Sequence, residues 1–277
     1  MKINPKNKEL ISFIKGKKNK GISDEYVLNI LNKYSKDFEE LLSKNLEILM
    51  KNKVFKELVR EIRTELYKVY GVFQVKRQGK KTDLIVKLEN AKNLNEIKDI
   101  SKELLKLHTS SRERLNEYDT IYSQIFKITK PKIIIDLASG LNPCSLILNN
   151  FKGECYAYDI SESDVSLLNK YFKIAKKYGI NGRAYEVNLD SFKFHKGDVC
   201  FLFKFLDLAE NRKEFFVNLI KSLDCNYLVV SFSKKTISMK NMRNVKRKWF
   251  INLLSKLNLK YEVLDFENEI FYLIKLK

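Results

Sequence analysis

The stretch KIIIDLASGLNPCSL, residues 132–146, decides the fold of this chain. It begins with three consecutive isoleucines and Asp136, the pattern of a strand that is buried in a parallel sheet. It continues into a turn whose one glycine, Gly140, is followed by Leu-Asn-Pro. Pro143 suits the first turn of a helix, where no backbone N–H is needed, and Asn142 is predicted to cap that helix. The stretch therefore predicts a strand, a ligand-facing loop and a helix.

After Pro131, short β-rich runs alternate with amphipathic helical runs. The β-rich runs are residues 132–138, 154–160, 183–189, 198–205, 227–232, 261–266 and 269–276, and the predicted helices are Ser161–Tyr178, Glu210–Leu223 and Arg243–Leu257. Such alternation predicts a mostly parallel sheet with helices on both faces. The last two runs are so close that they must form a hairpin with an antiparallel edge strand. This is the α/β layout of class I (Rossmann-like) methyltransferases, with seven strands instead of the six of the parallel dinucleotide fold.

The chain is strongly basic, with a net charge of +19 and a pI near 9.5 over 277 residues. Lys and Arg outnumber Asp and Glu by 25 to 15 up to Leu107, and by 28 to 19 after it. A charge of this size favours a polyanionic partner, most simply nucleic acid. A Lys-rich surface from a thermophilic or compositionally biased source is the alternative.

Composition also limits the class of protein. Apolar residues make up 44% and aromatic residues 12% of the chain, enough for a real core. No apolar run approaches the roughly 20 residues of a membrane span, and the N-terminus lacks the apolar segment of a signal peptide. Four widely spaced cysteines and two histidines predict neither a disulfide framework nor a metal site. These features predict a cytoplasmic protein. We also expect it to be a monomer.

The N-terminal part reads as helical, because apolar residues recur at three- and four-residue spacing, as in Val27, Ile30, Leu31 and Tyr34. Its basic residues either contact RNA or form the solvated faces of the helices. Residues 1–107 are therefore predicted to be a helical, basic, RNA-binding domain, and residues 108–277 a methyltransferase domain.

The loop after the first strand favours one kind of cofactor. A phosphate-binding G-x-G-x-x-G pattern is absent, which favours S-adenosylmethionine (SAM) over a dinucleotide. Gly140 lets a ligand approach the backbone closely. Asp159 ends the second strand, about 20 residues after the loop, where an acid accepts hydrogen bonds from ribose hydroxyls. Alternatively, Asp159 caps the helix that begins at Ser161.

Six segments together resemble the aminoglycoside-resistance 16S rRNA (guanine-N7) methyltransferases of the Arm and Rmt type. In chain order they are HTSSRERLNEYDTIYSQIF, IIIDLASGLNP, YAYDI, DVCFLFKFLDLAE, LVVSFSKKTI and EIFYLIKLK. The resemblance covers about His108 to Lys277, and H-x-S-S-R-E-R-L followed by D-x-x-x-G-L-N-P is its specific signature. It implies a divergent member that uses SAM to methylate N7 of a guanine in small-subunit rRNA near the decoding site.

The resemblance also implies a cofactor site. In the family pattern Arg112 grips the SAM carboxylate, and its alternative is an intrahelical pair with Glu113 or Glu117. The implied cofactor-binding residues are Arg112, Asp136, Ala138, Gly140, Asp159, Ile160, Asn188, Leu189, Asp190, Phe203 and Lys204. Phe203 is alternatively a core residue. Lys204, Ser231 and Lys235 are implied to lie near the target base, none of them as a certain catalytic group.

The implied RNA contacts gather after the fifth strand, at Lys234, Lys235, Lys240, Arg243, Lys246 and Arg247. The alternative is the solvated end of a helix. The family usually has Cys where Ser139 stands and Pro where Asp207 stands, and its longer loop after the fifth strand is reduced here to residues 233–242. The choice of RNA is therefore the least determined part of the prediction.

The chemistry agrees with the scarcity of histidine. Guanine N7 carries a lone pair and no proton, so it can attack a sulfonium methyl without a general base. Alignment of the reacting atoms can supply most of the rate. Two alternatives stay open: a tRNA guanine-N7 methyltransferase, and a non-catalytic RNA-binding or ribosome-assembly protein on the same fold.

Overall fold

The computed structural model describes residues 5–42, 45–71, 73, 78–189, 193–209, 211–235, 242 and 245–277. The chain forms two compact units. The first comprises Met1–Gln74 with Ile160–Ser163, and the second comprises Val75–Asp159 with Asp164–Lys277. The functional division that the sequence predicts at Leu107 stays a prediction.

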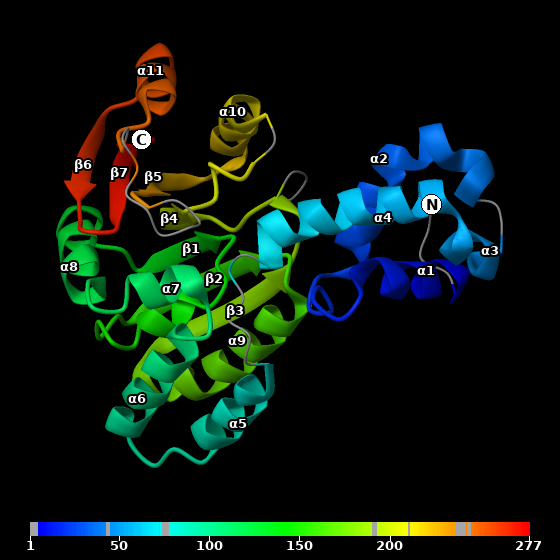
Figure 1. Cartoon of the computed structure of the whole chain (residues 1–277). Coiled ribbons are helices and arrows are strands. Elements are labelled where there is room, and N and C mark those ends of the chain that lie inside the picture. The colour runs from blue at the N-terminus through cyan, green and yellow to red at the C-terminus, as the bar shows by residue number, and fades with distance from the viewer. Residues whose placement is uncertain are drawn as a thin grey trace. The chain divides into compact units, whose positions relative to one another are not determined.

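The first unit is helical (Figure 1). Its helices are α1 (Pro5–Lys15), α2 (Asp24–Leu42), α3 (Leu46–Lys51), α4 (Lys53–Leu66) and the π-helical turn η1 (Tyr67–Gly71). The predicted stripe of α2 is confirmed at Val27, Ile30 and Leu31, which are buried in a core of its own. Arg63 closes the end of α1 by donating to the carbonyl oxygens of Phe13 and Ile14.

The second unit is built on a seven-stranded sheet in the order β3-β2-β1-β4-β5-β7-β6 (Figure 1). The strands are β1 (Ile133–Leu137), β2 (Gly153–Asp159), β3 (Ile180–Glu186), β4 (Gly197–Phe203), β5 (Cys225–Ser233), β6 (Tyr261–Asp265) and β7 (Glu269–Lys275). The first five strands run parallel, and β7 is antiparallel to both β5 and β6. The predicted class I methyltransferase fold is confirmed.

Helices cover both faces of this sheet, as predicted (Figure 1). They are α5 (Gln78–Glu89), α6 (Leu94–Leu105), α7 (Thr109–Glu113), α8 (Tyr118–Thr129), α9 (Glu162–Ala175), α10 (Arg212–Ser222) and α11 (Lys248–Lys256), with 3-10 turns η2 (Asn142–Ser145) and η3 (Lys176–Tyr178). Successive residues of β1 point to opposite faces, so Ile134 joins the core under α6, α8 and α9, while Ile135 joins the core under α10 and α11.

Some predicted boundaries differ from the structure. Helix α11 begins at Lys248, not at Arg243, because the backbone at Arg247 is not helical and its guanidinium binds Asp207. The predicted start of α10 at Glu210 lies outside the described residues. In the described part of the chain, no helix has both the length and the apolar character that crossing a membrane requires.

Candidate functional site

The carboxyl ends of β1 to β5 lie at one edge of the sheet, because these strands are parallel. Strand β7 runs the other way, so it begins at that edge, with Glu269 opposite Ser233. In open α/β sheets this edge is where ligands bind. Polar side chains from α7, from the loop after β1 and from three strands meet here.

The loop after β1 is held by its own backbone and by β2. Ala138 and Gly140 have φ angles of 49° and 48°, in the left-handed region. The Gly140 N–H donates to Asp159 Oδ2 at 2.7 Å, and the Ser139 N–H donates to the carbonyl oxygen of Tyr158 at 3.1 Å. Asp159 therefore fixes the loop with one oxygen of its carboxylate.

Gly140 is also required by its neighbour. A Cβ built on Gly140 would lie 2.9 Å from two atoms of the His108 ring, closer than real contacts allow. His108 is buried and its Nδ1 lies 2.9 Å from Ser110 Oγ. Burial lowers the pKa of His108 to about 4, so the ring is neutral at pH 7. The His-x-Ser start of the motif therefore packs α7 onto the loop.

Asn142 does not cap a helix, contrary to the sequence prediction. Leu141 precedes the 3-10 turn η2 and makes no side-chain cap. The Asn142 amide is instead buried: Nδ2 donates to Asp136 Oδ2 at 2.7 Å, while Oδ1 accepts from Arg114 Nη1 at 3.1 Å and from the Tyr118 hydroxyl at 2.9 Å. The amide oxygen that an N-cap would need therefore already accepts two hydrogen bonds.

Asp136 lies near the end of β1 and is 2% exposed. Burial raises its pKa to about 7, more than the Asn142 hydrogen bond and Arg114 lower it. A carboxyl with this pKa changes charge near neutral pH.

Arg114 and Glu269 form a buried ion pair. Arg114 Nε donates to Glu269 Oε2 at 2.8 Å, and the side chains are 2% and 0% exposed. The Ser231 hydroxyl donates to Glu269 Oε1. Burial alone would raise the pKa of Glu269, but Arg114 and Lys204 outweigh it and hold the pKa below its usual value. Glu269 is therefore ionised although no water reaches it.

Lys204 follows β4 in a left-handed conformation, with φ of 56°. Its backbone N–H donates to the carbonyl oxygen and to the hydroxyl of Ser231, both at 3.1 Å. Its Nζ lies 2.5 Å from Glu113 Oε2 and 3.2 Å from Glu269 Oε2. We call the connected residues Glu113, Arg114, Asn142, Lys204, Ser231 and Glu269 the Glu269 network.

Arg112, two residues before Arg114, is exposed on α7. Neither of its alternative partners binds it: Glu113 pairs with Lys204, and Glu117 accepts from the Glu267 N–H at 3.0 Å. Within the part of the chain that the structure describes, its guanidinium has no hydrogen bond or ion pair. Arg112 is thus available to bind an anionic group.

The other predicted cofactor residues fall into three groups. Asn188 and Leu189 follow β3, as expected for residues at a strand end. Phe203 is 7% exposed, stacks on Phe201 and lies under the Arg114 guanidinium, so it is a core residue as well as the end of β4. Ile160 belongs to the first unit, and Asp190 lies outside the described residues.

The predicted RNA-binding cations are not equally available. Lys234 pairs with Asp265 and donates to the carbonyl oxygen of Phe266 at 2.6 Å. Lys246 is exposed and Lys235 is partly exposed. Lys240 and Arg243 lie outside the described residues.

Arg247 is 8% exposed and forms an ion pair with Asp207. Its Nε lies 3.2 Å from both carboxylate oxygens of Asp207, and its Nη2 lies 2.6 Å from Oδ2. Nη2 also donates to the carbonyl oxygen of Ser233 at 3.1 Å. We call this pair the Asp207–Arg247 fork. The fork links the loop after β4 to the segment before α11. Arg247 is therefore already paired within the protein.

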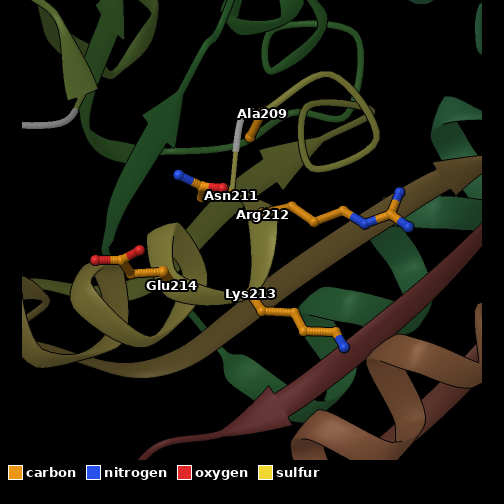
Figure 2. Close-up of a pocket in the computed structure, with 5 residues that line it drawn as sticks. All are labelled: Ala209, Asn211, Arg212, Lys213 and Glu214. Atoms are coloured by element: carbon orange, nitrogen blue, oxygen red, sulfur yellow. The ribbon is translucent and has the colours of Figure 1, made fainter.

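A pocket lies beside the start of α10 (Figure 2). It is lined by Ala209, Asn211, Arg212, Lys213 and Glu214. Figure 2 shows the Arg212 and Lys213 side chains extending away from that of Glu214. The described residues that line this pocket include none of the predicted cofactor residues.

Sequence reasoning missed the Glu269 network. Glu113 and Arg114 lie inside the motif that implied Arg112, but the spacing does not show which arginine is buried. Glu269 is the first residue of an antiparallel strand next to the five parallel ones. The predicted hairpin already placed Glu269 at the start of an antiparallel strand. Such a strand begins at the edge of the sheet where the parallel strands end, so the position of Glu269 could have identified it as a site residue.

Comparison with known proteins agrees with this geometry. The model of the ribosomal RNA methyltransferase (FmrO) family matches residues 47–251. A 16S rRNA (guanine(1405)-N(7))-methyltransferase of Proteus mirabilis is 26% identical over 199 residues, which cover 66% of this chain and 70% of the relative. The enzyme of the same description from Serratia marcescens is 29% identical over 137 residues, 49% of this chain and 53% of the relative.

Solved structures show the same fold. The crystal structure of the 16S rRNA methyltransferase RmtF in complex with S-adenosyl-L-homocysteine superposes with a TM-score of 0.73 at 23% identity, covering 99% of both chains. The structure of the 16S rRNA methylase RmtB gives a TM-score of 0.66 at 23% identity, again covering 99% of both chains.

Proposed function

Because the chain belongs to the ribosomal RNA methyltransferase (FmrO) family, we propose that it transfers a methyl group from SAM to N7 of a guanine in 16S rRNA near the decoding site. The sequence relatives from Proteus mirabilis and Serratia marcescens are named 16S rRNA (guanine(1405)-N(7))-methyltransferases, which supports the reaction and the class of RNA. The observation that carries the proposal is the strand-end site: a glycine loop fixed by Asp159, together with an exposed arginine on α7, Arg112, that has no partner among the residues the structure describes.

The residues present fit SAM. The Arg112 guanidinium, with no ion-pair partner in the described structure, complements a carboxylate by a bidentate fork. Ala138 and Gly140 form the turn after β1 in left-handed conformations, and Asp159 holds that turn from the end of β2, at the edge of the sheet where the proposal puts SAM. Asn188 and Leu189 supply the neighbouring wall in this proposal, together with Ile160 and Asp190 as the family pattern implies.

Bound SAM would supply an electrophilic methyl group on a sulfonium. Transfer of that methyl group would join its carbon to the lone pair of guanine N7 and leave the S–C bonding pair on sulfur. No proton moves, so the protein only has to align the three atoms. Lys204 and Ser231 lie at adjoining strand ends, where the proposal puts the target base, and Lys235 lies just beyond.

The basic surface would hold the RNA. In this proposal residues 1–107 bind RNA, and Lys235 and Lys246 add phosphate contacts in the methyltransferase domain. Lys234 and Arg247 support that segment from inside, since both are already paired. Lys240 and Arg243 complete the proposed set. The protein is proposed to act as a cytoplasmic monomer on the small ribosomal subunit.

The test is methylation of purified small subunits, bare 16S rRNA and tRNA with radiolabelled SAM, followed by mapping of the modified base. Label at a guanine N7 in 16S rRNA is the expected result. Label in tRNA alone would establish the tRNA alternative. Tight, salt-sensitive RNA binding with no transfer would establish the non-catalytic alternative.

Calorimetry with SAM tests the site itself. Arg112→Ala and Asp159→Ala are expected to weaken SAM binding at least tenfold, by removing the carboxylate contact and the loop anchor respectively. Lys102→Ala, an exposed change on α6, is the control and should bind SAM as the wild-type chain does. Unchanged binding in both site variants would show that the cofactor lies elsewhere.

A further inference from the structure

The Glu269 network holds four charged side chains almost out of contact with water. The side chains of Arg114, Lys204 and Glu269 are 2%, 6% and 0% exposed, and that of Glu113 is 16% exposed. Two are cations and two are carboxylates, so their formal charges cancel. Cancellation matters here because unbalanced charge in a buried site is poorly screened.

Glu269 is the member that both cations share. Its Oε2 accepts from Arg114 Nε at 2.8 Å and lies 3.2 Å from Lys204 Nζ, while its Oε1 accepts from the Ser231 hydroxyl. Glu113, by contrast, contacts only Lys204 within the network, at 2.5 Å. Removing Glu269 would therefore leave Arg114 with no carboxylate.

Lys204 and Arg114 connect Glu269 to two parts of the site, the end of β4 and the loop after β1. Lys204 is the first residue after β4 and is fixed there by Ser231. Arg114 donates to Asn142, which lies in the loop after β1 and binds Asp136. One carboxylate at the start of β7 thus sets the end of β4 and the cofactor loop together.

Methyl transfer from SAM keeps a positive charge at these strand ends. The sulfonium of SAM is cationic, its demethylated product S-adenosylhomocysteine (SAH) is neutral, and guanine becomes cationic when N7 is methylated. A site that carried an extra buried cation would disfavour the methyl donor more than the product.

Resting on the proposed function, we propose that Glu269 is a positioning residue for methyl transfer. It balances Arg114 and Lys204, so that the strand ends accept a cationic methyl donor with Lys204 and Asn142 held in place. It acts through these residues and does not itself touch the reacting atoms.

The decisive variant is Glu269→Gln, which keeps the side-chain shape and leaves the network with one net positive charge. Binding of SAM and of SAH is measured by calorimetry at one pH and ionic strength. The ratio of the SAM dissociation constant to the SAH dissociation constant is expected to rise roughly tenfold, the order of magnitude for the effect of one extra unit charge within a protein interior. The kcat/KM for SAM with small subunits should fall by at least the factor by which SAM binding weakens, with the KM for RNA little changed.

Three matched variants separate charge from packing. Glu269→Asp keeps the charge and should keep the SAM-to-SAH ratio of the wild type, even if it is less stable. The double variant Lys204→Met/Glu269→Gln restores a neutral network and should bring the ratio back. Glu262→Gln makes the same chemical change on the exposed face of β6 and should leave the ratio and the kcat/KM for SAM unchanged.

A purely structural Glu269 gives a different pattern. It would weaken SAM and SAH by the same factor, and the neutral double variant would not recover; either result overturns the proposal. If Glu269→Gln does not fold, Glu269→Asp and the double variant decide the question by the same ratio. A wild-type chain that binds neither SAM nor SAH would overturn the proposed function instead, before any variant is compared.

Discussion

The Glu269 network and the Asp207–Arg247 fork both bring an arginine and a carboxylate together, but they do so in different surroundings. Glu269 is fully buried and shares its oxygens among Arg114, Lys204 and Ser231. The Asp207 side chain is 30% exposed, although its contacts with Arg247 are the more regular two-pronged ones. We expect burial, more than the geometry of the pair, to set how much free energy of unfolding is lost when one partner is removed.

The largest expected loss of stability comes from breaking the buried Glu269 network. Glu269→Ala should lower the free energy of unfolding by about 3–5 kcal/mol, because Arg114 is left without a carboxylate in a dry interior. Urea denaturation followed by circular dichroism measures the change. Glu262→Ala, on the exposed face of β6, is the control and should stay within about 0.5 kcal/mol of the wild type. A loss for Glu269→Ala as small as the control's would contradict the assigned role of burial.

Asp136 is a buried carboxyl that binds Asn142 of the Glu269 network, and it should make the stability of the chain depend on pH. Its pKa is raised to about 7 in the folded chain against 3.8 as the ordinary value. The folded state therefore holds this proton more tightly, so the wild type loses stability as pH rises from about 4 to 7 and loses no more above it. Asp136→Asn should be more stable than the wild type at pH 8 by on the order of 4 kcal/mol.

The asparagine at position 136 can still accept from Asn142 Nδ2, so the variant removes the charge and keeps the bond. The advantage of Asp136→Asn should shrink steadily toward zero as pH is lowered to 4. Denaturation at several pH values measures it. An advantage that is constant from pH 4 to pH 8 would show that Asp136 does not titrate in this range.

Breaking the Asp207–Arg247 fork should cost less stability than breaking the Glu269 network. Asp207→Ala is expected to cost about 1 kcal/mol, because water can reach the site and Arg247 keeps the carbonyl oxygens of Ser233 and Val245. Thermal denaturation measures the loss, and Asp207→Asn, which can still accept a hydrogen bond, should cost less. A loss for Asp207→Ala as large as that of Glu269→Ala would remove the distinction between the two regions.

The smallest effect should come from a pair that has no buried member. Glu103 and Lys106 pair on the surface of α6 at 2.5 Å, with side chains 49% and 48% exposed. Glu103→Ala should change the free energy of unfolding by no more than about 0.5 kcal/mol, and less in high salt. A loss above 1 kcal/mol would mean that exposed pairs contribute more than their solvation suggests.

Local patterns predicted the framework of the second unit. The isoleucines of β1 and the hairpin of β6 and β7 gave the sheet, because hydrophobic periodicity and loop length act within a few residues. Gly140 and Asp159 followed from their positions at strand ends. Their hydrogen bond shows why the two occur together, although the pattern alone suggested a ribose contact.

Local patterns could not sort the charged residues. Arg112 and Arg114 are two residues apart in one motif. Arg112 is exposed and has no partner among the described residues, whereas Arg114 is buried and bound on several sides. Arg247 counted as a surface cation in the sequence, but Asp207 holds it inside. Sequence patterns predict that a charged residue is exposed unless its partner is known. The partners of Arg114 and Arg247 are far away along the chain, so local patterns do not identify them.

The sequence by itself determined the order of strands and helices along the chain, the basic character of the chain, and the loop after β1 with its one required glycine. Only the tertiary structure decided which cations are available to a ligand and which are consumed within the fold. The physical reason is the range of the interactions. Periodicity acts between near neighbours, whereas Arg114 and Glu269 are 155 residues apart and meet only because β7 runs antiparallel to β5.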